Sequence, residues 1–357
     1  MPILKVLKKP ENIFFNILEL LKELVGKFGR SVSPKVELES LCGLQVKRNC
    51  PTRWWTDYLM CERILEIHKK EAEALNTIIG SYSKTWKIRK LKQVDYDLVS
   101  YFVEFFKVFK LKSDLMGGEK FSNIHFVHST VKLFRRHINK WREHLVIGSF
   151  VRDFEIEFSA YFDIIDNPDH PNYQQIYSVA AYLSPYHQAM LTSREKKESK
   201  EYLRSEVSLM EDQMVATQEP VTAPVHVDSA ADNLMPGMDL LLDLIQEGEV
   251  GNEGNTCVLE QAFNSDIEKL EKDTNQYIER VKAGKSSENQ EDILEYWNKM
   301  RYSSLSKLPD FACNLLVAPA SSVPSERLFS ISGLLSSGTY LVRGEYFVII
   351  TEESKAF

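Results

Sequence analysis

The pattern of apolar and polar positions predicts helices through most of the chain. Between residues 11 and 28, apolar side chains recur at steps of three and four residues, which places them on one face of a helix. The same spacing runs from Trp54 to Ile79, after Pro51 and Thr52 supply a break and an N-cap. Further helical patterns cover residues 96–111, 129–146, 154–165 and 173–186. We therefore expect a mainly α-helical protein.

Alternation typical of strands is scarce. The segment YFVII, residues 346–350, is the best strand candidate, because Val, Ile and aromatic residues favour extended backbone. No apolar run approaches the roughly 20 residues that a membrane helix needs, so we expect no membrane partner.

Composition changes between residues 205 and 262. Proline, glycine and acidic residues gather there and aromatic residues are few, so the segment cannot bury enough apolar surface to offset its chain entropy. We predict an acidic disordered linker, preceded by a helical body over 1–204 and followed by a C-terminal region over 263–357. An apolar island at 238–245 predicts either a short docking helix or a partner-binding motif.

The net charge of −7 hides a division within the chain. Residues 205–268 contain 14 acidic residues and no Lys or Arg, so the remainder carries +7. Attraction to phosphate depends on the local field and not on the total charge. The overall charge therefore does not exclude a nucleic-acid partner.

Several kinds of site leave no trace in the sequence. The five cysteines form no C-x-x-C pair, and no phosphate-binding glycine loop, zinc-protease motif or hydrolase nucleophile motif occurs. His125 and His128 are more typical of local hydrogen bonding than of a metal site. Because the first residues lack the apolar centre of a signal peptide, we expect an intracellular protein with reduced thiols.

Two basic clusters contain aromatic residues. One spans residues 84–92 around Trp86, and the other spans 132–142 around Trp141. Each predicts either salt-dependent contact with phosphates or a solvated helix face.

The stretch SSVPSERLFSISGLL, residues 321–335, separates into two faces when placed on a helix. Leu328, Ile331 and Leu335 fall on one face, and Glu326 lies with Ser330 on the opposite one. The small polar face around Glu326 is either solvated or leaves room for a substrate.

These residues resemble a known family. The segment from Ile293 to Gly333 resembles the C-terminal dimerisation region of hAT-superfamily transposases, the hobo and Activator group, and their domesticated relatives. Trp297, a helix over 305–316 and the string SERLFS carry this resemblance. The element TRWWTDYLMCER, which begins at Thr52, also resembles the family's arginine-tryptophan element at the head of its helical insertion.

The resemblance implies an RNase H-like core that is split by a helical insertion and uses two aspartates and a glutamate to bind catalytic metals. Glu326 matches the glutamate. Both aspartates, with a BED-type zinc finger, belong to family segments that precede the arginine-tryptophan element, and we expect them to be missing from this chain. The core is then incomplete, and we expect no enzyme, no cofactor and no metal site, since two-metal chemistry needs several carboxylates. Asp163, Asp166 and Asp169 are more typical of a loop that caps the next helix than of substitute ligands.

Trp54 matches a family tryptophan that stacks on a base, but its position on an apolar stripe also predicts a core residue. Arg53 is expected to pair with a phosphate or with a neighbouring carboxylate. The nucleic-acid candidates are Arg53, Trp54, Lys87, Arg89, Lys90, Arg135, Arg136 and Lys140.

The expected function is protein dimerisation, with itself or with related hAT-derived chains, with residual DNA contact. By the resemblance we expect a nuclear protein, and otherwise a cytoplasmic one. A residual Mg²⁺-dependent transposase or nuclease, or a nonfunctional transposon fragment, are the alternatives. The tail diverges from the family after about residue 335, which weakens the dimer hypothesis. The dimerisation candidates are Trp297, Leu308, Phe311, Leu315, Leu328, Phe329, Ile331 and Leu335.

Overall fold

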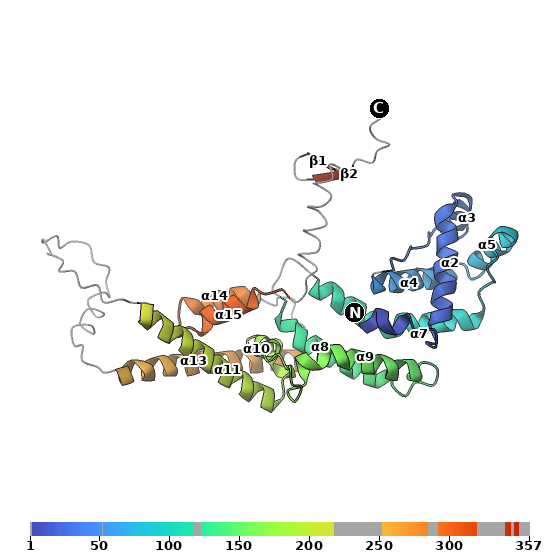
Figure 1. The fold of residues 1–357 in the computed structure, drawn as a ribbon. Helices are drawn as coiled ribbons and strands as arrows, with labels where there is room; N and C mark the ends of the chain where they lie inside the picture. The colour runs from blue at the N-terminus through green and yellow to red at the C-terminus, as the bar shows by residue number, and fades with distance from the viewer. Residues whose placement is uncertain are drawn as a thin grey trace. The chain divides into compact units, whose positions relative to one another are not determined.

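The computed structural model is mainly α-helical, as the periodicity predicts (Figure 1). It describes residues 2–51, 53–117, 123–217, 252–284, 292–319, 340–343 and 346–349. The helices of the first half are α1 (Pro2–Leu7), α2 (Phe15–Arg30), α3 (Ser33–Cys42), α4 (Trp54–Lys70), α5 (Ala74–Ser81), α6 (Ser83–Trp86), α7 (Gln93–Met116), α8 (His125–Trp141) and α9 (Gly148–Asp166). Those of the second half are α10 (Ile176–Tyr182), the 3₁₀ turn η1 (Gln188–Met190), α11 (Ser193–Thr217), α13 (Asn252–Lys282), α14 (Ile293–Arg301) and α15 (Leu308–Leu316).

A short hairpin lies near the C-terminus. Strands β1 (Tyr340–Arg343) and β2 (Tyr346–Ile349) pair antiparallel, with Tyr340 opposite Ile349. The strand expected in this segment is therefore confirmed over the four described residues of β2.

The chain divides into two compact units. Unit 1 comprises residues 1–118 and 130–174, and unit 2 comprises residues 119–129 and 175–357. This division differs from the predicted body over 1–204, because α10 and α11 contact α15 and belong to unit 2.

Helix also extends into both ends of the predicted linker. Helix α11 continues to Thr217, and α13 begins at Asn252. Val207 of α11 and Phe263 of α13 are buried in one apolar cluster, which gives these ends the packing that composition alone does not reveal. Residues 218–251, with the apolar island, lie outside the described part of the chain, so their predicted disorder stays a prediction.

Unit 1 is packed around aromatic rings. The ring of Phe14 in the turn before α2 meets Phe150 of α9 edge to face, with centroids 4.8 Å apart and planes at 79°. Phe105 and Phe106 of α7 contact each other and Phe154 of α9 in similar edge-to-face geometry. All five side chains are at most 4% exposed, so these rings form the centre of the unit.

The helical pattern from Trp54 to Ile79 is interrupted in the structure. Helix α4 ends at Lys70, Glu71 adopts an extended backbone, and α5 begins at Ala74. Ile67 before the break and Leu75 after it are both buried. The turn therefore preserves the apolar face that the sequence shows, which is why the spacing does not reveal the break.

Candidate dimerisation region and nucleic-acid contacts

Trp297 and Leu308 lie in the core of their own chain. Trp297 on α14 is 0% exposed, and its Nε1 donates a hydrogen bond to the backbone oxygen of Leu183 over 2.9 Å. Leu308 begins α15 and is equally buried in the same apolar cluster. The sequence predicts both as dimerisation contacts, whereas the structure uses them to join α14 and α15 to the segment that follows α10. They stabilise unit 2 and are not free to contact a partner.

Other apolar residues of this region reach the surface. Phe311 and Leu315 of α15 are half-buried at the edge of the cluster, while Leu305 and Val317 are 74% and 66% exposed. The remaining dimerisation candidates, Leu328, Phe329, Ile331 and Leu335, lie outside the described residues, as does Glu326.

Two tyrosine hydroxyls attach α13 to the rest of unit 2. Tyr182 donates to Glu271 Oε1 and Tyr296 donates to Asp273 Oδ2, each over 2.9 Å. Burial, followed by the neighbouring carboxylate, raises the pKa of both phenols. Both hydroxyls therefore keep their protons and stay donors at neutral pH.

The loop between α14 and α15 is held by one buried carboxylate. Asp266 Oδ2 of α13 accepts hydrogen bonds from Ser304 Oγ over 2.5 Å and from Ser306 Oγ over 2.7 Å. Ser306 Oγ in turn accepts from the backbone nitrogen of Leu308 at the start of α15. This connection was missed in the sequence, because nothing in the spacing of three such common residues distinguishes them.

Histidines of α8 are buried at the start of unit 2. His128 Nε2 lies 3.0 Å from Glu195 Oε1, so its hydrogen-bond partner lies 67 residues away in sequence and not nearby, as the local pairing predicted for it would require. His125 is also buried, and this burial lowers the pKa of its imidazole to about 4, although Asp292 acts in the opposite sense. His125 therefore remains neutral at physiological pH.

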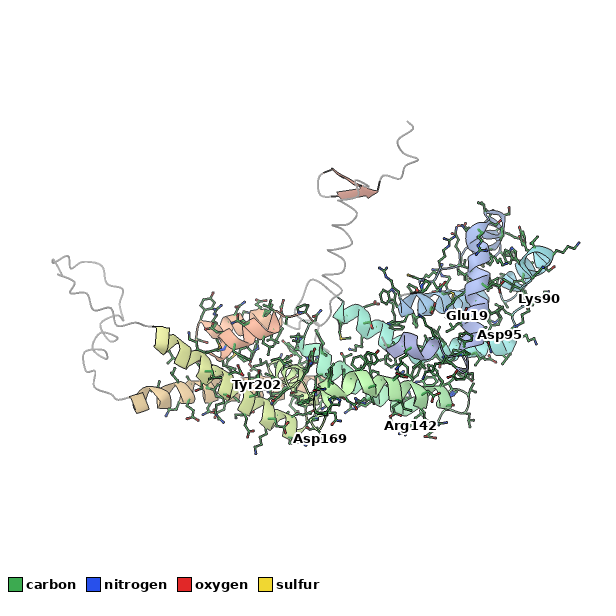
Figure 2. The ribbon with its side chains drawn as sticks, in the orientation of Figure 1. Glu19, Lys90, Asp95, Arg142, Asp169 and Tyr202 are labelled. Atoms are coloured by element: carbon green, nitrogen blue, oxygen red, sulfur yellow. The ribbon has the colours of Figure 1, made fainter. Side chains whose placement is uncertain are left out.

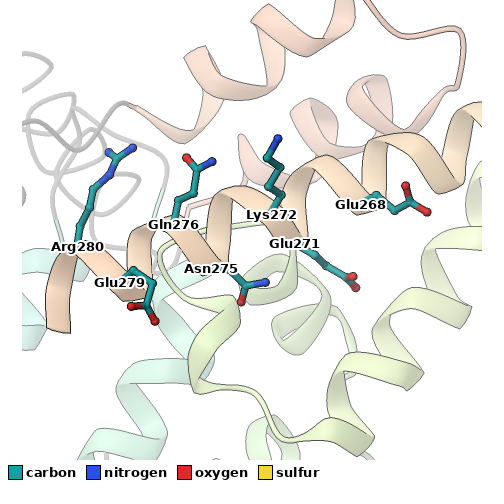
Figure 3. A pocket seen from close by; sticks show the side chains of 7 residues that line it. All are labelled: Glu268, Glu271, Lys272, Asn275, Gln276, Glu279 and Arg280. Atoms are coloured by element: carbon teal, nitrogen blue, oxygen red, sulfur yellow. The ribbon is translucent and has the colours of Figure 1, made fainter. Parts of the chain in front are cut away.

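A groove follows the exposed side of α13 (Figure 3). Side chains of both charges line it, and Lys272, Gln276 and Arg280 project to one side of the helix while Glu271 and Glu279 project to the other. The lining residues are Glu268, Glu271, Lys272, Asn275, Gln276, Glu279 and Arg280.

Trp54 belongs to the core of unit 1. Its indole is 1% exposed and lies 5.8 Å from the ring of Phe106 between centroids. The core interpretation of this residue agrees with the structure, in which the indole offers no face to a nucleic-acid base. The guanidinium of Arg53 lies over the ring of Trp55 at 5.8 Å, at the exposed start of α4.

Arg135 is held by carboxylates of α9. Its guanidinium donates to Asp163 over 2.5 Å and to both oxygens of Asp166 over 2.5 and 2.7 Å. Burial lowers the pKa of Arg135, but the hydrogen bonds and charges of Asp166 and Asp163 outweigh it and raise the pKa. These aspartates lie in the last turn of α9 and not in a capping loop, and their long-range pairing with Arg135 was missed in the sequence.

The other basic candidates differ in their availability. Arg89 forms a two-pronged ion pair with Asp95, over 2.5 and 2.8 Å. Lys87 and Lys90 on the same loop are exposed, as are Arg136 and Lys140 on α8. Figure 2 shows Lys90 and Asp95 in this part of unit 1.

The described ranges hold neither a metal-binding cluster nor a membrane span. No three or more His, Cys, Asp or Glu side chains gather there in a way that could hold a metal ion. No helix in those ranges is long and apolar enough to cross a membrane.

Comparison with known proteins identifies relatives of part of the chain. The model of the hAT family C-terminal dimerisation region matches residues 273–338, which include the end of α13 and all of α14 and α15. The chain is also 27% identical over 187 residues to zinc finger BED domain-containing protein 39 of Caenorhabditis elegans. That alignment covers 47% of this chain and 19% of the relative, so the chain matches about a fifth of the relative's length. The chain is therefore similar to hAT-type, transposase-related proteins, and residues 273–338 carry the match to their dimerisation region.

Proposed function

We propose that this transposase-related chain is a non-catalytic protein that associates with a second copy of itself or with related chains through residues 263–335. The observation that supports this most directly is the match of residues 273–338 to the hAT dimerisation region. Because α13, α14 and α15 share one core, they present their outer residues as a single folded surface.

The surface available for pairing excludes the residues that the core already uses. With Trp297 and Leu308 buried, the apolar side chains left on the described part of this region include half-buried Phe311 and Leu315 and exposed Val317. The helical spacing of Leu328, Ile331 and Leu335 adds a further apolar face to the expected interface. A specific interface buries about 1,000 Å² or more, so several of these residues must act together.

Analytical ultracentrifugation of the whole chain tests this proposal. We expect a mass that rises with concentration, and a dimer dissociation constant raised at least about tenfold by Leu328→Glu or Val317→Glu, since each buries a charge in the interface. Leu145→Glu is the matched control, because Leu145 is fully exposed in unit 1. A monomer at high micromolar concentration, or an equal effect of the control, would contradict the proposal.

The absence of catalysis is a separate part of the proposal. Glu326 alone would hold a metal poorly, and the carboxylates of Asp163 and Asp166 are bound to Arg135. The competing function is a residual metal-dependent nuclease. DNA nicking in Mg²⁺ or Mn²⁺ that disappears in Glu326→Gln would establish that competitor and refute the non-catalytic role.

Contact with DNA in the nucleus completes the proposal. It is supported by the family relationship, by the zinc-finger name of the C. elegans relative and by the exposed lysines and arginine on unit 1. A fluorescent fusion that is excluded from the nucleus would contradict the location. Failure of the whole chain to bind a DNA duplex at low salt would contradict the DNA contact.

A further inference from the structure

We propose that residues 84–92, here called the basic loop, form a preorganised binding site for the phosphate backbone of duplex DNA. This inference rests on the DNA contact proposed above, and it specifies where the contact lies and which chemistry it uses. It goes further by assigning the contact to lysines and by giving Arg89 a positioning role.

The basic loop concentrates positive charge. Residues 74–92 contain four lysines and one arginine and no Asp or Glu. All four ammonium groups belong to exposed residues, and in the described part of the chain none of them forms an ion pair with a carboxylate. The lysines are Lys84, Lys87, Lys90 and Lys92.

Buried side chains fix the direction in which these lysines point. Trp86, Ile88 and Leu91 are buried, so the residues between them face solvent. Lys87 makes this alternation possible by adopting a left-handed backbone with φ of 55°, which is uncommon for a residue with a side chain. A conformation of this kind persists only where the surrounding structure holds it.

Two side chains outside the loop hold its backbone. Buried Asn76 of α5 accepts from the backbone nitrogen of Leu91 over 2.8 Å and donates to its oxygen over 2.9 Å. Asp95 of α7 binds Arg89 and also accepts from the backbone nitrogen of Lys92 over 2.7 Å. Arg89 therefore positions the loop, and its charge is paired with the carboxylate of Asp95.

Lys90 is supported in the same way. A methyl group built at Gly80 would lie 3.6 Å from Lys90 Cε, so the stem of this lysine lies along the last turn of α5. An ordered loop loses little conformational entropy when its charges bind a ligand, which favours binding.

Trp86, the aromatic residue within the loop, is not available to bases. Trp86 is buried, stacks on Tyr82 with centroids 5.1 Å apart, and meets Phe28 edge to face at 5.2 Å. Proteins that grip single strands use exposed aromatic rings for stacking, whereas lysine ammonium groups act as point charges toward phosphates. This arrangement favours a duplex and predicts binding without sequence preference.

The affinity of the whole chain for a labelled 20-base-pair duplex, measured by fluorescence anisotropy at about 50 to 200 mM salt, tests this inference. Changing Lys84, Lys87, Lys90 and Lys92 together to Gln should lower the slope of log affinity against log salt by about 0.9 for each phosphate that the variant no longer neutralises. Two duplexes of unrelated sequence should behave alike.

A control with the same change in charge separates a local site from a general field. Lys8, Lys35, Lys69 and Lys107, which lie elsewhere in unit 1, are changed to Gln together. We expect the control to retain most of the salt slope. An equal reduction of the salt slope in the control would overturn the inference. So would a loop variant that loses affinity for single-stranded DNA but not for the duplex, or a chain whose loop lysines bind a polyglutamate peptide more tightly than the duplex.

The result also distinguishes this inference from the proposed function. If the unmodified chain binds no duplex at about 50 mM salt, the DNA contact and the basic loop both fail. If it binds and the loop lysines do not matter, the loop alone fails. Self-association measured by ultracentrifugation should be unchanged in the loop variant, because its lysines lie in unit 1 and the matched dimerisation region lies in unit 2.

Discussion

The two units differ in what specifies their interior. Unit 1 is centred on phenylalanine rings from α7, α9 and the turn before α2, which meet edge to face. In unit 2, hydrogen bonds join segments that are far apart in sequence, such as Trp297 to Leu183, 114 residues away, and Tyr182 to Glu271, 89 residues away. Unit 2 therefore depends on individual donors such as the Trp297 indole, because removing it leaves the oxygen of buried Leu183 without this partner.

The largest expected effect is a loss of stability in unit 2 that leaves unit 1 folded. Trp297→Ala should reduce the free energy of unfolding by about 3–5 kcal/mol, because it removes a buried ring and leaves the Leu183 oxygen without its donor. The backbone amides of unit 2 should then exchange faster with solvent. Hydrogen exchange followed by mass spectrometry should show reduced protection across unit 2 with unit 1 preserved.

The matched variant for unit 1 is Trp54→Ala, since both indoles are at most 1% exposed. Its reduced protection should be confined to unit 1. If either variant unfolded both units to the same extent, the division into two units would not describe the stability of the chain.

Acid should affect unit 2 through His125. Burial lowers the pKa of this histidine to about 4 from an ordinary value of 6.5, so the unfolded chain binds its proton first. The contribution of neutral His125 is complete above pH 6.5 and is lost as the pH falls toward 4. We expect stability to fall by about 2–3 kcal/mol by about pH 4.5.

Urea unfolding at about pH 7 and about pH 4.5, followed by the protection of unit 2, measures this change. His125→Leu should make the pH dependence of unit 2 shallower by about the same amount. An unchanged dependence would show that other groups determine the acid response.

The smallest effect compares one carboxylate from each unit. Asp266→Asn weakens two short serine hydrogen bonds in a buried site and should cost about 1–3 kcal/mol. Asp95 is also buried, but its partner Arg89 has a half-exposed side chain, and the amide oxygen of Asp95→Asn can still accept from the backbone nitrogen of Lys92, so this change should cost about 1 kcal/mol or less. Thermal unfolding of the two variants measures the difference, and a larger cost for Asp95→Asn would reverse the comparison.

Much of the helical fold was predictable because amphipathic spacing reports which residues are buried. The spacing of Trp54, Tyr58 and Cys61 correctly indicates a core face, and all three are buried. It does not reveal the break at Glu71, since the turn keeps the apolar face continuous.

The candidate site was harder to predict because a buried helix face has two possible partners. The same apolar pattern would place Trp297 against its own chain or against a second copy, and only the position of Leu183 decides between them. Likewise, the pairing of Arg135 with aspartates 28 and 31 residues away has no signal in local spacing. Charge composition therefore overstates the number of cations available to DNA.

The bond from Trp297 to Leu183 has a consequence for anyone who expresses the matched segment alone. A fragment that starts at residue 273 would lack α10 and α11 and would present the uncovered indole to any apolar surface it meets. Pull-down experiments with such a fragment would detect nonspecific hydrophobic binding and not selective dimerisation. A useful fragment should begin no later than α10, near residue 175.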